Sequence, residues 1–140
     1  MIRTRVDAPD LWRDSLAVSG LLAAPVPPDS ASRDAIIRSM PAPLRFAADE
    51  PLLLYAEVYG LGSSSGRALY TVEYEFVPVD SAGLVSLRFS RHPPAAGTTE
   101  ERLVIAPGQV ARGRYAITLR VRDEIRGREA GSSRIYVELW

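Results

Sequence analysis

Side chains that usually carry enzyme chemistry are sparse in this sequence. It contains one histidine, His92, and no cysteine. Residues 62–66 (GSSSG) match the G-x-S-x-G pattern of a serine nucleophile, which works only on a sharp strand-to-helix turn with a histidine and a carboxylate in reach. Here the segment lies between two alternating apolar stretches, which indicates a hairpin loop. We therefore expect no catalytic residue and no enzyme.

Ligands for a metal or cofactor are equally scarce. Without cysteine or a second histidine, His92 cannot anchor a zinc site of the usual ligand set, and it precedes two prolines in an expected loop. The acidic pairs at residues 49–50, 100–101 and 123–124 fall at the ends of predicted strands. Loop carboxylates can bind calcium, but none of these pairs has the spacing of a known calcium loop. We expect solvated turn residues, with no metal and no cofactor, and keep calcium as the alternative.

Arginines concentrate near the C-terminal end of the chain. Six of them are Arg112, Arg114, Arg120, Arg122, Arg126 and Arg128. Acidic residues are interleaved with these arginines, and the seventeen basic and seventeen acidic residues of the chain balance to a net charge of zero. Glu73 and Glu75 offer cross-strand partners. The pattern predicts an ion-paired outer face of a sheet and no nucleic-acid partner.

The elements that must position these residues follow a two-residue period. Alternating or apolar runs bounded by Gly, Pro and Ser predict strands at residues 16–23, 52–59, 69–77, 84–89, 102–105, 114–122 and 134–139, after a brief alternation at residues 2–6. This pattern favours an all-β fold, an antiparallel immunoglobulin-like (fibronectin III-like) β-sandwich of seven to nine strands in one domain spanning residues 1–140. A closed barrel is the alternative architecture.

The predicted strands at residues 69–77 and 114–122 supply most of the expected core. Their apolar faces consist of Tyr70, Val72, Tyr74, Phe76, Tyr115, Ile117, Leu119 and Val121. Tyr115 follows a turn at Pro107-Gly108 and opens an alternating run. In many immunoglobulin-like sandwiches a tyrosine at this place donates its hydroxyl to the backbone of the preceding corner.

Two connections lack the strand period. Residues 24–43 form a long connection in which residues 32–39 predict two turns of helix, with Asp29, Ser30 or Ser32 as the N-cap. Such a length suggests a short helix or a flap over the domain. Residues 90–101 are rich in Pro and Gly and are expected to be loop.

One strand suggests a surface for a partner. Glu57 lies in the middle of the strand at residues 52–59 and should face out, since burying an unpaired carboxylate is costly. The period then places Leu52, Leu54, Ala56 and Val58 inside. We predict a candidate interaction face that consists of Leu53, Tyr55, Glu57, Tyr59, Glu73 and Arg120. The alternatives are an ordinary outer face, a carbohydrate-binding face that uses the tyrosines, and a face buried under residues 24–43.

Three stretches together resemble a known family. They are Val18-Ser19-Gly20-Leu21-Leu22-Ala23 after the step Ala8-Pro9-Asp10, the strand at residues 51–61 followed by Tyr70-Thr71-Val72-Glu73-Tyr74-Glu75, and the stretch around Tyr115. This order resembles the C-terminal β-sandwich of bacterial GWxTD-domain proteins and of von Willebrand factor A-related secreted proteins. The GWxTD motif itself is not in this sequence. The resemblance implies a piece of a larger extracytoplasmic protein and carries over no site residue.

The expected function is therefore that of a non-catalytic structural or protein-interaction module. Its partner would be a neighbouring domain of the same chain or another protein, and a carbohydrate-type ligand is the alternative. No run approaches the ~20 apolar residues that span a bilayer, and residues 1–10 lack the apolar stretch of a signal peptide. We expect residues 1–10 to end a preceding linker or strand, with a periplasmic or extracellular location if a longer precursor exists.

Overall fold

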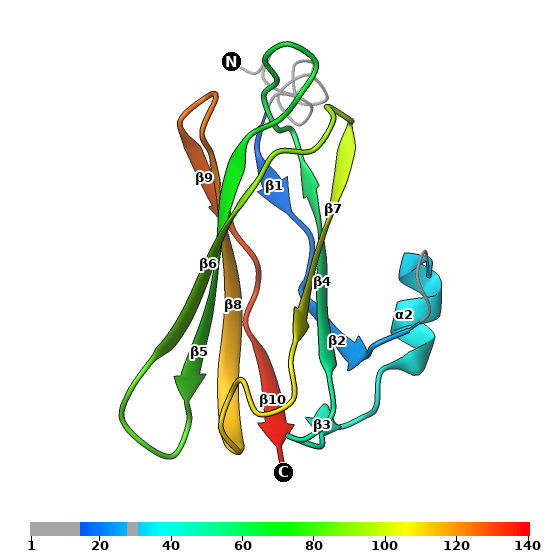
Figure 1. Ribbon diagram of the computed structural model, residues 1–140, viewed down its shortest axis with the longest axis vertical. Helices are drawn as coiled ribbons and strands as arrows, with labels where there is room; N and C mark the ends of the chain where they lie inside the picture. Colours follow the sequence, from blue (N-terminus) through cyan, green and yellow to red (C-terminus); the bar gives the residue numbers. More distant parts are fainter. Residues whose placement is uncertain (1–14, 28–30) are drawn as a thin grey trace, which may run out of the picture.

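A computed structural model of the chain describes residues 15–27 and 31–140. The alternation at residues 2–6, the expected linker at residues 1–10 and two of the candidate caps, Asp29 and Ser30, lie outside this part of the chain. The described residues form two β-sheets packed face to face (Figure 1), and one short helix lies outside them.

The first layer, sheet A, has four strands centred on β4 (Leu52–Tyr59). On one side β4 pairs with β7 (Thr98–Ile105), and on the other with β1 (Ala17–Val18) and β2 (Leu22–Pro25). All these pairs are antiparallel. The core face of β4 carries the residues expected there, since Leu52, Leu54, Ala56 and Val58 are all buried in the core between the sheets.

The second layer, sheet B, has six strands. In spatial order they are β3 (Arg45–Phe46), β10 (Ile135–Leu139), β8 (Gly113–Asp123), β5 (Tyr70–Pro78) and β6 (Val85–Arg91), with β9 (Arg128–Gly131) also paired to β8. Only the short β3–β10 pair is parallel among the described pairs. The predicted all-β sandwich is confirmed. The described residues contain ten strands, because β1 and β2 are separate and β3 and β9 were not predicted.

The predicted strand at residues 16–23 is broken by one extra residue. Ala17 lies opposite Tyr59, whereas Leu22 lies opposite Tyr55, so the register against β4 shifts by one position between β1 and β2. Ser19 spans the break, since its backbone N–H donates to the Glu57 carbonyl and its Oγ accepts from the Glu57 N–H, both at 2.8 Å. The result is a bulge that alternation alone does not reveal.

Half of the expected loop at residues 90–101 is strand. Ser90 and Arg91 complete β6, and β7 begins at Thr98, so only residues 92–97 lie between the two strands. The prediction was wrong because two inward positions of β7 are polar: Thr99 and Glu101 are buried there. A period read from apolar residues misses a strand of this kind.

The predicted core residues of β5 and β8 are confirmed. All eight of them are buried, none above 5% exposure. Phe76 and Tyr115 pack edge to face, with ring centroids 6.0 Å apart. The predicted backbone contact of Tyr115 is also present, because its hydroxyl donates to the carbonyl of Ala111 at 2.7 Å. This bond ties the turn before β8 to the strand that follows it.

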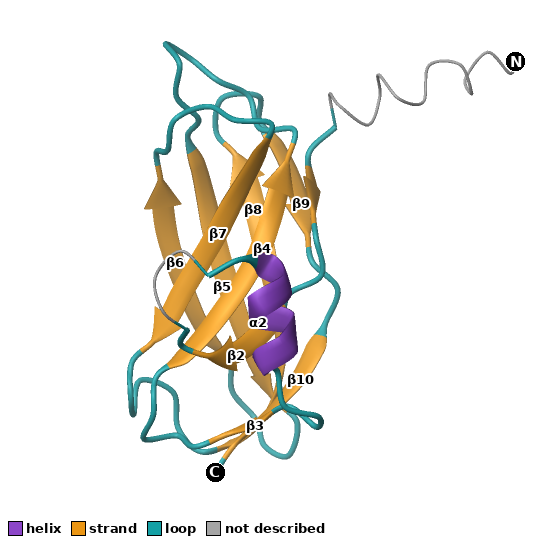
Figure 2. Cartoon of the chain, turned by 90° about the vertical axis from the view of Figure 1, so that its right-hand side faces the viewer, coloured by secondary structure: helices purple, strands orange, loops and turns teal. Residues whose placement is uncertain are grey.

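The long connection at residues 24–43 contains the expected helix. Helix α2 (Arg33–Ser39) begins after Ser32, whose Oγ accepts from the Ala35 N–H at 3.2 Å and so satisfies one free donor of the first turn. Figure 2 shows α2 lying across the outer face of sheet A, over β2 and β4. This placement decides which part of that face meets solvent.

The Tyr115 hydroxyl should contribute to stability. In Tyr115→Phe the Ala111 carbonyl loses its donor, and we expect a loss of about 0.5–1.5 kcal/mol in the free energy of unfolding, measured by urea denaturation. Tyr136→Phe is the matched control, because Tyr136 is 62% exposed. Equal stability of the two variants would contradict a structural role for the Tyr115 bond.

Candidate interaction surface

The six residues of the predicted interaction face lie on two opposite surfaces. Leu53, Tyr55, Glu57 and Tyr59 belong to β4 in sheet A, whereas Glu73 and Arg120 belong to β5 and β8 in sheet B. The prediction of a single face was wrong because the chain crosses to the other sheet between β4 and β5. Alternation shows which side of a strand is apolar, but it does not show in which sheet the strand lies.

Leu53 and Tyr55 point away from the main core, as predicted, but they are not exposed. They are 2% and 0% exposed, and they pack in a second apolar cluster with Ala24 and with Ile36 of α2. Of the alternatives, the one in which residues 24–43 fold over this face is therefore correct. A partner cannot reach these two side chains while α2 is in place.

A polar network borders the covered face. Glu57 of β4 lies directly opposite Glu100 of β7, and the Tyr55 hydroxyl is within hydrogen-bond distance of both carboxylates, at 3.3 and 3.2 Å. Burial, reinforced by these two negative charges, raises the pKa of Tyr55. The Tyr59 hydroxyl donates to Glu57 at 2.7 Å, and this hydrogen bond is the main reason why its pKa is raised.

Two arginines balance this pair of carboxylates and hold the covering segment. Arg33 of α2 lies 3.7 Å from Glu57, and Arg102 of β7 lies 3.2 Å from Glu100. Arg102 also donates to the carbonyl of Ala31 at 2.8 Å and lies over the Tyr55 ring, 5.0 Å from its centroid. The polar groups on this side of the domain therefore bind the chain's own covering segment.

The outer face of sheet B carries exposed apolar side chains instead. Tyr136, Ala116 and Val77 lie in register across β10, β8 and β5, and Leu84, just before β6, continues this line. We call these four residues the apolar row. Tyr136 is 62%, Val77 46% and Leu84 56% exposed, and Val79 beside them is 52% exposed. Within the part of the chain that the structure describes, no helix covers this face (Figure 2).

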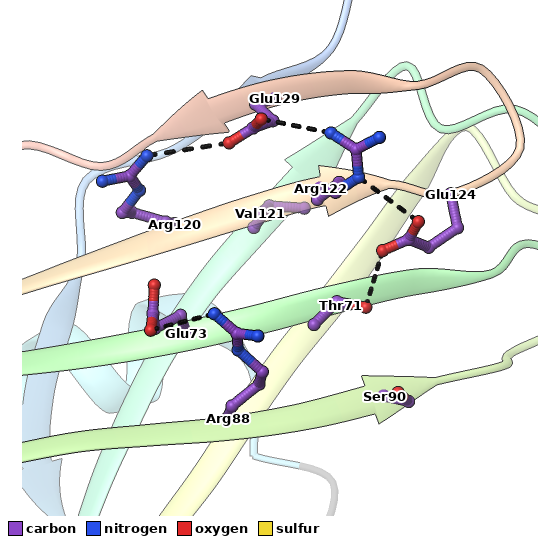
Figure 3. Close-up of a pocket in the computed structure, with 9 residues that line it drawn as sticks. All are labelled: Thr71, Glu73, Arg88, Ser90, Arg120, Val121, Arg122, Glu124 and Glu129. Carbon is purple, nitrogen blue, oxygen red and sulfur yellow. Dashed lines mark hydrogen bonds and ion pairs between the residues drawn. The ribbon is translucent and has the colours of Figure 1, made fainter.

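Ion pairs occupy the other half of this face (Figure 3). They line a shallow cavity of about 470 Å³. The ion pairs and their N···O distances are Glu73–Arg88 at 3.3 Å, Arg120–Glu129 at 3.6 Å, Arg122–Glu129 at 3.1 Å and Arg122–Glu124 at 3.3 Å. A hydrogen bond from Ser86, aided by Arg88, lowers the pKa of Glu73. The ion-paired outer face predicted from the sequence is confirmed here.

The serines and the histidine considered for chemistry lie in loops. Residues 62–66 join β4 to β5 and no helix follows them; Ser64 bridges to Arg67 within the loop. The guanidinium Nη2 of Arg67 also donates to the backbone carbonyl of His92 at 2.7 Å. Residues 62–66 form a loop as predicted, but the loop is not a hairpin, because it joins β4 of sheet A to β5 of sheet B. The strand-to-helix turn of a serine nucleophile is not formed.

Two of the three acidic pairs are not the solvated turns that we expected. Glu100 and Glu101 lie within β7. Asp123 is fully buried, and its carboxylate accepts the backbone N–H groups of Gly62 at 2.7 Å, Ile125 at 3.0 Å and Arg126 at 3.2 Å. In residues 15–27 and 31–140, no three His, Cys, Asp or Glu side chains gather as metal ligands would.

Glu101 is the residue that sequence reasoning missed. It points from β7 into the core and is 1% exposed. Its carboxylate accepts the hydroxyls of Tyr70 at 2.9 Å and Tyr74 at 2.5 Å, and two N–H groups of Arg91 at 3.1 and 3.0 Å. Extending the two-residue period backwards from Leu103 and Ile105 would have placed Glu101 inside.

These contacts link the two sheets through one ion pair, in which Glu101 is buried and Arg91 is partly exposed. Glu101 comes from sheet A, and Tyr70, Tyr74 and Arg91 come from sheet B. Burial, together with the Glu101 charge, raises the pKa of both tyrosines. The hydrogen bonds to Glu101 raise the pKa of Arg91. Every oxygen of the buried carboxylate is thus satisfied by donors from the opposite layer.

A mutant cycle should reveal how strongly Glu101 and Arg91 depend on each other. Arg91→Leu leaves Glu101 charged and buried beside two neutral hydroxyls, and we expect a loss of about 3–5 kcal/mol in the free energy of unfolding. The double variant Arg91→Leu/Glu101→Leu should recover part of this loss, because no charge remains in the core. Glu101→Leu is the second single variant of the cycle. Urea denaturation of the two single variants and the double variant measures the coupling free energy between Arg91 and Glu101. If the losses of the single variants simply add up in the double variant, the two residues are not coupled.

The buried tyrosines predict a loss of stability in alkali. Because the pKa values of Tyr70 and Tyr74 are raised above the ordinary 10.0, the unfolded chain loses these protons first as the pH rises. Stability should be unaffected by them below about pH 10 and fall above it. In Tyr74→Phe, and more so in Tyr70→Phe/Tyr74→Phe, the urea midpoint should fall less steeply above that pH. Equal slopes for wild type and double variant would contradict the assignment.

Comparison with known proteins assigns no family to the chain. The resemblance to the sandwich of GWxTD-domain and von Willebrand factor A-related proteins therefore stays an expectation, and the function must be argued from the described surfaces. None of the helices in the described residues is long and apolar enough to cross a membrane. No protein-family model matches the sequence, and no curated protein matches it significantly.

Proposed function

We propose that this domain is a non-catalytic protein-interaction module that docks through the outer face of sheet B. The observation that carries this proposal is the difference between the two outer faces. Leu53 and Tyr55 on the outer face of sheet A are covered by the chain's own α2, although Val104 of β7 stays exposed there, whereas Tyr136, Val77 and Leu84 are exposed together on sheet B. A contiguous exposed apolar patch with a polar rim is typical of a docking surface.

The ion pairs beside the apolar row suit the rim of such an interface. The neighbouring arginines are already paired with Glu73, Glu124 and Glu129. A partner that binds here would therefore bury no unpaired charge. Docking would then derive its affinity from the apolar row and its orientation from the charged half. Glu73 and Arg120, two residues of the sequence-based face, belong to this rim.

The partner class in this proposal comes from the resemblance noted in the sequence. The proposed partner is a neighbouring domain of a larger extracytoplasmic protein, or a second protein there. The spatial order β10-β8-β5-β6 opposite β1-β4-β7, together with the Tyr115–Ala111 bond, supports an immunoglobulin-like module. Modules of this architecture serve many functions, so the architecture alone does not identify a partner, and docking is inferred from the exposed surface of sheet B.

A carbohydrate ligand is the second candidate, but the tyrosines of β4, from which it was predicted, support it only weakly. Tyr55 is buried and cannot stack on a sugar, and Tyr59 is partly buried. Tyr136, at 62% exposure, is the tyrosine that could form such a platform.

Footprinting with hydroxyl radicals can test the docking face. We expect Leu84 and Tyr136 to be labelled in the purified domain and protected in the native protein within the cells that make it. Val104 and Ile37 are matched controls, since they are 49% and 41% exposed and lie on β7 and α2. Their labelling should be similar in both settings.

Two results would count against protein docking at this face. One is equal labelling of Leu84 and Tyr136 in both settings. The other is protection of Tyr136 in the purified domain on addition of soluble glycans, which would support the carbohydrate alternative. The variant Leu84→Ser/Tyr136→Ser should leave the thermal melting temperature of the domain unchanged, because these side chains contribute little to its core.

A further inference from the structure

Strand β6 is a free edge of sheet B. It pairs with β5 on one side, and no other described strand pairs with it. Its seven residues contain no proline or glycine, and its register against β5 is regular from Val85 to Arg91. A straight edge of this kind can template pairing with another strand.

The alternation of backbone hydrogen bonds along β5 shows which N–H and C=O groups of β6 point away from sheet B. The Val79 N–H donates to the Arg114 carbonyl, and the Glu124 N–H donates to the Leu69 carbonyl. Odd-numbered residues of β5 therefore bond to β8, and even-numbered residues bond to β6. Since the even residues of β5 lie opposite Val85, Leu87, Phe89 and Arg91, the backbone groups of Ser86, Arg88 and Ser90 point away from the sheet.

The side chains of β6 also leave apolar surface at this edge. Val85, Leu87 and Phe89 face the core, yet they are only partly buried. Their neighbours in the same rows of β5, Phe76, Tyr74 and Val72, are completely buried. The difference arises because nothing in the described chain continues sheet B beyond β6, and an added strand would cover these side chains.

We propose that two copies of this chain associate by antiparallel pairing of their β6 strands. Leu87 lies on the two-fold axis, opposite Leu87 of the other copy. This register places Val85 opposite the other copy's Phe89 and Ser86 opposite its Arg88. Ser86 and Arg88 are the residues with outward backbone groups, so they form the hydrogen-bonded pairs, and the two sheets B become one continuous sheet.

Charge selects this register over its neighbour. Moving the two-fold axis to Arg88 would place the arginines of both copies directly opposite each other, which is unfavourable. With the axis at Leu87, each Arg88 faces the other copy's Ser86, whose hydroxyl donates to the Glu73 carboxylate at 2.8 Å. Arg88 thus meets a negative charge of the other copy at the pairing edge. The pairing uses the backbone edge of β6, whereas the docking proposal uses the outer face of sheet B. The two meet only at Leu84, just before β6, so the dimer does not depend on the docking proposal.

Removing one outward N–H tests the pairing in solution. At high protein concentration, sedimentation analysis should show a dimer for the wild type. Ser86→Pro removes an N–H that does not bond to β5, and proline is tolerated at such an edge position. By symmetry two hydrogen bonds are lost, and we expect the dimer to weaken at least about tenfold. Ser86→Ala is the matched control, since it keeps the N–H and should remain dimeric.

Disulfide trapping tests the register independently of that variant. The chain has no cysteine, so a single introduced thiol gives an unambiguous result. Leu87→Cys should form a crosslinked dimer on mild oxidation, because directly opposed residues in a non-hydrogen-bonded pair have Cβ atoms about 4.5–5.5 Å apart. Arg88→Cys should crosslink poorly. A monomeric wild type, or efficient crosslinking of Arg88→Cys instead of Leu87→Cys, would overturn the proposal.

Discussion

The arrangement of the two sheets depends on one buried negative charge. The Glu101 carboxylate enters the core from β7, and it accepts four hydrogen bonds from β5 and β6 in the opposite layer. A slip of β7 or β6 by one residue would turn Glu101 or Arg91 to the outside and leave its partner buried without compensation. The contact between Glu101 and Arg91 therefore disfavours a one-residue slip of either strand.

The apolar side chains on the two outer faces have different surroundings. On sheet A, residues 24–43 return over β4 and bury Leu53 and Tyr55 under Ile36, with Arg33 and Arg102 bound at the border. On sheet B, arginines and glutamates from neighbouring strands pair with one another, and the apolar row stays exposed beside them. The centre of the outer face of sheet A is therefore covered within the monomer, whereas the outer face of sheet B has a row of apolar side chains available for contact.

Sequence reasoning succeeded where alternation was strict and failed where it carried no information. The strand at residues 52–59 and the core faces of β5 and β8 follow from a two-residue period of apolar side chains. β7 was partly missed because its inward positions include the polar residues Thr99 and Glu101. The groups that bind Glu101 lie 10 or more residues away in the sequence. Tyr55 was assigned to solvent because a strand's own pattern does not show what covers it. The bulge at Ser19 depends on pairing with Glu57, which is equally non-local.

The buried charge also affects the edge of sheet B. Natural edge strands are commonly protected by charged side chains that would clash with, or be stripped of water by, an added strand. In β6 both arginines are already bound within the chain, Arg91 to Glu101 in the core and Arg88 to Glu73 on the outer face. Because each is paired with a carboxylate, an approaching strand meets no uncompensated positive charge, although the Arg88 side chain itself stays exposed. The ion pairs that fix the position of β6 in the monomer therefore also reduce the electrostatic protection of its edge.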